Sequence, residues 1–128
     1  MNLLLDTHIW LWFVSDPAKI GRRAMQELAD PASTLWLSPI STWEILTLNA
    51  KGRIRLTKPP RDWLRAAAAG MQEAYLTHEI ALEARAINLH QDPSDRFLAA
   101  TAKVLNLVLV TADEKLLGLP DIRTMANR

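Results

Sequence analysis

Four acidic residues in this sequence have the type and placement needed to hold a hard metal ion. They are Asp6, Glu44, Asp95 and Asp113. Carboxylates crowded into one cleft repel each other, and some stay protonated unless a positive charge offsets them. Mg²⁺ and Mn²⁺ prefer oxygen ligands, and such an ion can orient a phosphate and generate hydroxide near neutral pH. The acids therefore predict a Mg²⁺ or Mn²⁺ site, and the absence of cysteine and of paired histidines argues against zinc.

Two of these acids follow predicted β-strands. Asp6 comes directly after the apolar run 2–5, and Asp113 lies three residues beyond a run of strand formers at 107–110. In an open parallel sheet, functional groups collect beyond the carboxyl ends of the strands. We therefore expect Asp6 and Asp113 to lie at one edge of the sheet.

The other two acids fall in predicted helices. Asp92 followed by Pro93 has the pattern of an N-cap and a first helical residue, which places Asp95 in the first turn of a helix ending near Asn106. Glu44 lies about two turns into an otherwise uncharged helix that starts after a strand. Both helices can bring a carboxylate to the crevice that Asp6 and Asp113 line.

Each acid also has a purely structural interpretation. Asp6, Asp92 and Asp113 can cap helices, and Asp95 can complement a helix dipole, which contributes about 0.3–1 kcal/mol. Glu44 is the hardest to explain in this way, because an acid in an apolar helix costs desolvation unless it is satisfied. Capping explains Asp92 better than metal binding does.

The remaining elements complete an α/β pattern. Further helices are predicted over 8–14, 19–29, 39–51, 59–70, 79–89 and 113–117, and further strands over 34–38, 73–76 and 122–124. Strands that alternate with helices predict a layered α/β fold with a mainly parallel sheet. We expect one domain over residues 1–128, since this length suits a single core.

Charge is unevenly distributed along the chain, whose formal net charge is only +1. Between residues 51 and 65, Asp62 is the only acid beside six basic residues: Lys51, Arg53, Arg55, Lys58, Arg61 and Arg65. Such a basic strip suits a polyanion partner. A solvated, arginine-rich surface loop explains the same charges equally well.

The composition narrows the cellular setting. No apolar run approaches the roughly 18 residues that span a membrane, and the start MNLLLDTHIW lacks a basic region typical of a signal peptide. The lack of cysteine fits a reducing compartment. We expect a cytoplasmic protein with no membrane partner.

Three stretches together resemble a known family. They are LLLDTHIWLW, SPISTWEI and DPSDRFLAATAKVLNLVLVTADEKL, and the pairing of D-P-x-D-R with V-T-x-D is the most specific feature. The chain resembles PIN-domain ribonucleases, more narrowly the VapC-type toxins of toxin–antitoxin pairs. The resemblance covers nearly the whole chain. It implies a three-layer α/β/α sandwich around a mainly parallel sheet of about four to five strands, and hydrolysis of RNA phosphodiester bonds.

The resemblance also implies roles for individual residues. Asp6 and Asp95 would be the most direct ligands of Mg²⁺ or Mn²⁺, Glu44 would hold a second ion or a metal-bound water, and Asp113 would complete the site. Cleavage would leave 3′-hydroxyl and 5′-phosphate ends. The basic strip, including Lys51, Arg53, Arg55, Lys58 and Arg61, is the candidate surface for the RNA backbone.

Supporting residues and partners follow from the same resemblance. Thr7 and Thr111 would fix the acids or their water shell, and Arg96 would serve in pairing or positioning. The implied partners are a second copy of the chain, in a homodimer, and a small antitoxin whose tail blocks the acidic cleft.

Two rival functions remain open. One is a metal-dependent phosphatase or receiver-like aspartate site. A phosphatase nucleophile motif has the pattern D-x-D, whereas the chain reads Asp6-Thr7-His8. A catalytically inactive module that only binds RNA or protein is the rival outside enzymes, because nearly every acid has a capping explanation. Scattered residues, namely His8, His78 and His90 together with Trp10, Trp12, Trp36 and Trp43, are interpreted as packing, surface or interface residues.

Overall fold

The chain folds around a five-stranded sheet in which every neighbouring pair of strands is parallel. The computed structural model describes residues 1–128. The strands, in the spatial order β3-β2-β1-β4-β5, are β1 (Asn2–Leu5), β2 (Thr34–Leu37), β3 (Gln72–Glu73), β4 (Val108–Thr111) and β5 (Arg123–Ala126). The expected α/β sandwich with a mainly parallel sheet of four to five strands is confirmed.

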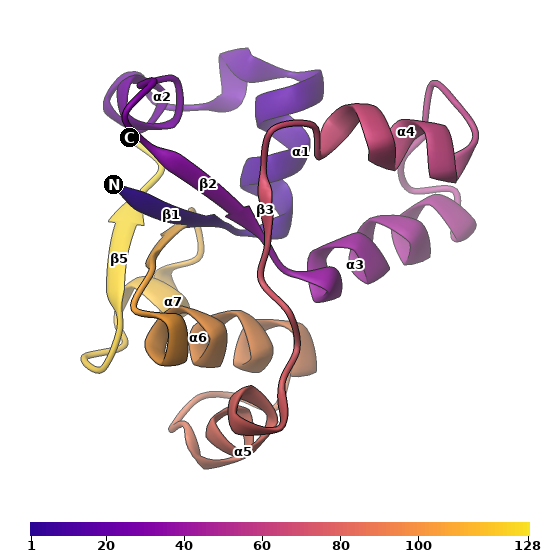
Figure 1. Ribbon diagram of the computed structural model, residues 1–128. Helices are drawn as coiled ribbons and strands as arrows, with labels where there is room; N and C mark the ends of the chain where they lie inside the picture. Colours follow the sequence, from indigo (N-terminus) through magenta and orange to yellow (C-terminus); the bar gives the residue numbers. More distant parts are fainter.

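Helices cover both faces of this sheet (Figure 1). They are α1 (Thr7–Ser15), α2 (Arg22–Leu28), α3 (Pro39–Ala50), α4 (Pro60–Ala67), α5 (His78–Ala86), α6 (Pro93–Leu105) and α7 (Glu114–Leu117), with one 3₁₀ turn at Pro17–Lys19. None of them is long and apolar enough to cross a bilayer.

Side chains that alternate along β1 contact the helices on both faces of the sheet. Successive side chains of a strand point to opposite faces. Leu3 and Leu5 pack in a cluster that includes residues of α1, α2, α3 and α4, whereas Leu4 packs in a second cluster with residues of α6 and α7. All three leucines are fully buried, so β1 is central to both layers. Helix α5 lies outside α6, away from the sheet (Figure 1).

The strand order reverses direction beside β1. The chain passes from β1 outward to β2 and β3, and later places β4 on the other side of β1, with Leu4 opposite Leu109. Loops that leave two such strands diverge and open a crevice at the carboxyl edge of the sheet. The amide of Asp6 donates to the carbonyl oxygen of Val110 at 3.0 Å, which joins the two strand ends at this crevice.

Several predicted elements differ from the structure, among them the helix expected over 59–70, which ends at Ala67. Three further differences have a clear cause. The helix expected over 19–29 is shorter, because Gly21 has an extended backbone and its amide donates to the side chain of Asn127. The strand expected over 73–76 is β3, which ends at Glu73 because its partner β2 ends at Leu37. The helix expected over 79–89 ends at Ala86, where an extended backbone begins.

Candidate metal centre

Asp6 is fixed at the junction of β1 and α1. It caps α1, since its Oδ1 accepts the backbone N–H of Thr7 at 2.6 Å, and its Oδ2 accepts the hydroxyl of Thr111 at 2.6 Å. Burial raises the pKa of Asp6, and these two hydrogen bonds partly oppose that rise. Both oxygens of this carboxylate are therefore held in place, one by the first residue of α1 and one by the last residue of β4.

Thr111 links Asp6 to Asp113. Its side chain is fully buried at the end of β4, and its hydroxyl oxygen also accepts the backbone N–H of Asp113 at 3.0 Å. A hydroxyl has one proton to donate and two lone pairs to accept with, so one threonine can serve both acids. Asp113 in turn caps α7, because its Oδ1 accepts the N–H of Lys115 at 2.8 Å.

Glu44 reaches the crevice from α3. Its carboxylate accepts the hydroxyl of Thr7, which also lies 2.9 Å from the hydroxyl of Ser41. Thr7 and Ser41 are buried, so this network lies beneath the surface of the site. Burial raises the pKa of Glu44, the Thr7 hydrogen bond lowers it, and the nearby charge of Asp6 raises it again.

Asp95 has the most strongly perturbed carboxyl group of the site. It lies in the first turn of α6, where burial and then the charges of Asp92, Asp113, Asp6 and Glu44 raise its pKa to about 7. The other acids thus come close enough to act on Asp95. A carboxylate in this position is stabilised by any cation that enters the crevice.

The four acids fit a divalent cation. Lysine and arginine side chains form no salt bridge with any of them, and the only basic side chain in such contact is His90, whose Nε2 lies 3.1 Å from Oδ2 of Asp95. Ligand atoms of His90, Asp95 and Asp113 lie within 4.8 Å of one another. Asp6 and Glu44 fall outside this tightest group but add oxygen donors nearby. A set dominated by carboxylates suits Mg²⁺ or Mn²⁺.

The structure thus brings the predicted acids and both predicted threonines to one place. Asp92, interpreted as a helix cap, accepts the N–H of Ser94 at 3.0 Å. Arg96 contacts no carboxylate, since it donates only to backbone carbonyl groups. The prediction that Arg96 pairs with an acid is therefore wrong. The alternative, that Arg96 positions its neighbours, stays a prediction.

The sequence did not predict that His90 lies near the acids. His90 was grouped with packing and surface histidines, yet its ring lies against Asp95. The available signal was its place two residues before the N-cap Asp92, which brings it to the turn that carries Asp95. His8 also lies near the site, because its charge lowers the pKa of Asp6.

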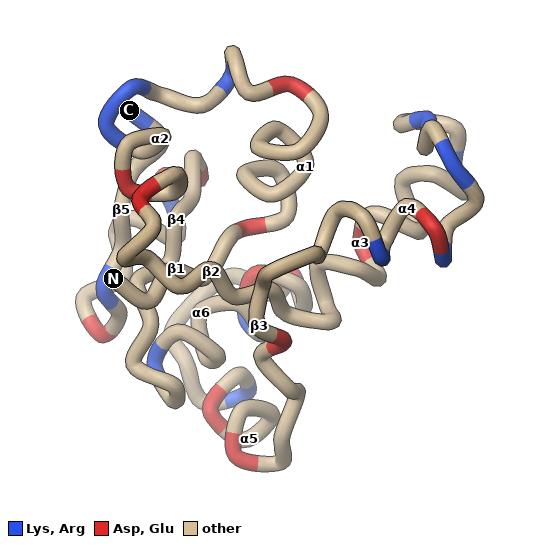
Figure 2. Tube along the Cα trace, turned by 45° about the horizontal axis from the view of Figure 1, so that its top comes forward, with Lys and Arg blue, Asp and Glu red and all other residues tan.

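The basic strip lies apart from the acids, in the loop between α3 and α4 and in α4 itself (Figure 2). All six of its basic side chains are exposed, and none forms a salt bridge.

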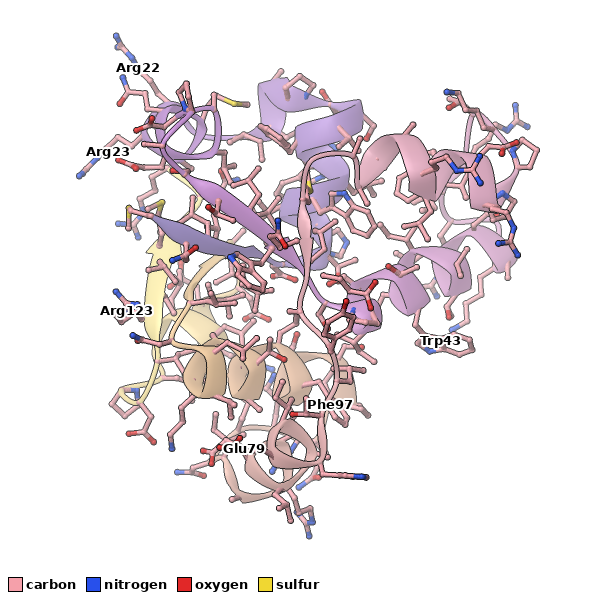
Figure 3. The ribbon with its side chains drawn as sticks, in the orientation of Figure 1. Arg22, Arg23, Trp43, Glu79, Phe97 and Arg123 are labelled. Carbon is pink, nitrogen blue, oxygen red and sulfur yellow. The ribbon has the colours of Figure 1, made fainter.

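Trp10 is fully buried, as expected of a core residue. Trp43 instead projects from α3 and is 65% exposed, so it is no core residue (Figure 3).

Comparisons with known proteins show which family this chain resembles along most of its length. The PIN domain family matches residues 3–121. Ribonuclease VapC22 of Mycobacterium tuberculosis is 32% identical over 117 residues, which span 90% of this chain and 89% of that protein.

Solved structures share the fold at low sequence identity. A chain in the crystal structure of VapBC2 from Rickettsia felis, bound to a DNA fragment from their promoter, has a TM-score of 0.74 and 16% identity, with 98% of each chain covered. A chain of DNA-bound VapBC from Salmonella typhimurium has a TM-score of 0.69 and 17% identity, with 100% of this chain and 99% of that chain covered.

Proposed function

Because the chain belongs to the PIN domain family, we propose that it is a metal-dependent ribonuclease and the toxin of a toxin–antitoxin pair. The observation that carries the proposal is the crevice at the end of β1 and β4, where four acids meet without a lysine or arginine partner. The 32% identity to a protein named as a ribonuclease supports the nuclease activity. The VapBC complexes with the same fold agree with an antitoxin partner.

The acids divide the work of holding the ion. Asp6 and Asp95 hold Mg²⁺ or Mn²⁺ most directly, Glu44 holds a second ion or a bound water, and Asp113 completes the site. A bound ion supplies positive charge beside the scissile phosphate and lowers the pKa of water. Thr7 and Thr111 keep Glu44 and Asp6 aimed into the crevice, since each donates its hydroxyl proton to one of these carboxylates.

RNA binding is assigned to the basic strip. Its exposed and unpaired side chains, Lys51, Arg53, Arg55, Lys58, Arg61 and Arg65, are free to contact phosphates.

Cleavage leaves 3′-hydroxyl and 5′-phosphate ends. The protein acts in the cytoplasm as a homodimer of single-domain chains, and an antitoxin tail blocks the acidic crevice.

The test is RNA cleavage by the purified protein. We expect cleavage with Mg²⁺ or Mn²⁺, none with EDTA, and a strong loss of cleavage in Asp6→Asn and in Asp95→Asn. Cleavage that ignores EDTA or survives both substitutions contradicts the proposal. Ends mapped on the products check the cleavage polarity.

The same experiment addresses the rival function. Asp6, Asp92 and Asp113 do cap helices, which is what an inactive binding module needs of them. Such a module binds RNA in a gel-shift assay with no cleavage under any metal condition, and its RNA affinity is unchanged in Asp95→Asn.

A further inference from the structure

The loop before α6 is held by a buried arginine. Arg96 is 8% exposed, and its guanidinium group has five N–H donors. All five are used on backbone carbonyl oxygens at the end of α5 and in the loop after it: those of Ala84, Arg85, Ile87, Leu89 and His90, at 2.6–3.2 Å. This clamp explains why α5 stops at Ala86, and it fixes the backbone of His90.

The contacts of His90 define which ring nitrogen carries the proton. Its Nδ1 accepts the backbone N–H of Asp92 at 3.3 Å, so in the neutral ring the proton lies on Nε2. That Nε2 is buried and has no aligned hydrogen-bond partner, and the carboxylate oxygen Oδ2 of Asp95 lies 3.1 Å from it. The N–H group therefore faces Asp95, and a small rotation of either side chain aligns the bond.

Asp95 differs from its neighbours in what holds it. The carboxylates of Asp6 and Glu44 each accept a threonine hydroxyl, whereas no hydroxyl and no backbone amide donates to Asp95. His90 is the only side chain that can supply a proton donor to it. Carboxylates that bind metals are commonly held by such outer hydrogen bonds.

We propose that His90 is a positioning residue of the metal centre, which donates its Nε2 proton to Oδ2 of Asp95 and leaves Oδ1 for the ion. The inference rests on the proposed metal site, and it adds a residue to it. Direct coordination by His90 is the rival, because its Nε2 lies near Asp95 and Asp113. Coordination through Nε2 moves the proton to Nδ1, which breaks the contact with the Asp92 amide.

Two substitutions separate the functions of the two ring nitrogens. His90→Gln keeps a side-chain N–H near the position of Nε2, whereas His90→Asn keeps an acceptor near Nδ1 but is too short to reach Asp95. We measure Mn²⁺ binding by isothermal titration calorimetry without RNA, and thermal melting in EDTA to verify folding. Mn²⁺ affinity should stay close to wild type in His90→Gln and fall about 10–100-fold in His90→Asn.

His78→Gln is the matched control. His78 is an exposed histidine at the start of α5, so its replacement should leave Mn²⁺ affinity unchanged. Pulsed electron paramagnetic resonance of the Mn²⁺ complex adds a direct signature, and we expect no coupling to a directly bound ¹⁴N nucleus.

The outcomes are distinct. Equal Mn²⁺ affinity in wild type and in folded His90→Asn overturns the inference but leaves the nuclease proposal intact. A ¹⁴N coupling that disappears in both His90 variants shows coordination instead of positioning. Wild-type protein that binds no Mn²⁺ overturns both proposals, and wild type that binds Mn²⁺ but cuts no RNA overturns only the nuclease.

Discussion

The two sides of the acidic crevice are built differently. On the side of α1 and α3, threonine hydroxyls hold the carboxylates of Asp6 and Glu44. On the side of α6, Asp95 has no such donor, and its pKa is raised to about 7. Hydroxyl donors therefore hold one side. The other side depends on the proposed contact with His90 and on a cation that offsets its charge. Because of this difference, we expect the pH dependence of ion binding to be determined mostly by Asp95.

The largest effect is expected from Asp95→Asn. Loss of this carboxylate should lower RNA cleavage by a factor on the order of 10³, because an ion contributes several kcal/mol of charge stabilisation. Cleavage rates in Mg²⁺ and Mn²⁺ provide the measurement. Asp92→Asn is the matched control, since asparagine also caps helices and the fold is kept. An equal loss of cleavage in both variants contradicts the assignment of Asp92 as a helix cap and Asp95 as a metal ligand.

Thr111→Val tests the organised side. Valine has nearly the same shape but cannot donate to Asp6, so we expect cleavage and Mn²⁺ affinity to fall about 10–100-fold. The pKa of Asp6 should rise further, because that hydrogen bond lowers it, and the pH profile of cleavage should move to higher pH.

Thr101→Val is the control for this change. Thr101 is also fully buried, but its hydroxyl donates to the carbonyl oxygen of Phe97 within α6. Its replacement should alter the melting temperature without changing Mn²⁺ affinity. If Thr111→Val does no more than Thr101→Val, the hydroxyl does not organise Asp6.

A pH titration tests the side that depends on the ion. With its pKa raised to about 7, Asp95 is protonated below that pH in the metal-free protein, and the ion must displace the proton. Apparent Mn²⁺ affinity should therefore be constant above about pH 8 and fall by up to about tenfold per pH unit below pH 7. Asp92→Asn removes a charge that raises this pKa, so the fall should begin at lower pH. An affinity that is flat between pH 5 and 8 contradicts the raised pKa.

The smallest effect is expected far from both sides, in the basic strip. The double substitution Arg53→Gln and Arg55→Gln should weaken RNA binding and leave Mn²⁺ affinity unchanged. The slope of log K for RNA against log salt concentration should become shallower by up to about 0.7 for each phosphate contact that is lost. Fluorescence anisotropy with labelled RNA at several salt concentrations gives both quantities. Arg22→Gln with Arg23→Gln on α2 is the control for charge alone (Figure 3). Equal effects from both pairs indicate a general charge effect.

Local signals account for what the sequence predicted well. The span of β1, the cap at Asp92 and the turn at Asn106, which has a φ of 54°, each depend on residues close in the chain. The strand ends then placed Asp6 and Asp113 at one edge of the sheet. These patterns require no knowledge of distant contacts.

Distant contacts explain what the sequence did not predict. The early end of α5 depends on Arg96, which donates to carbonyl oxygens up to 12 residues away, and the same clamp places His90. The hydroxyl of Thr7 meets Glu44 across 37 residues, a pairing that no local pattern encodes. The family resemblance implied a role for Thr7 but not this partner.

Calorimetric titration of Mn²⁺ into wild type, Asp6→Asn and Asp95→Asn at pH 8 shows whether one ion is shared between β1 and α6. If the two sides of the crevice form one metal centre, each substitution alone should abolish or strongly weaken the binding seen in wild type. Mn²⁺ binding that is unchanged in either folded variant contradicts it, because the ion would then not be shared between β1 and α6.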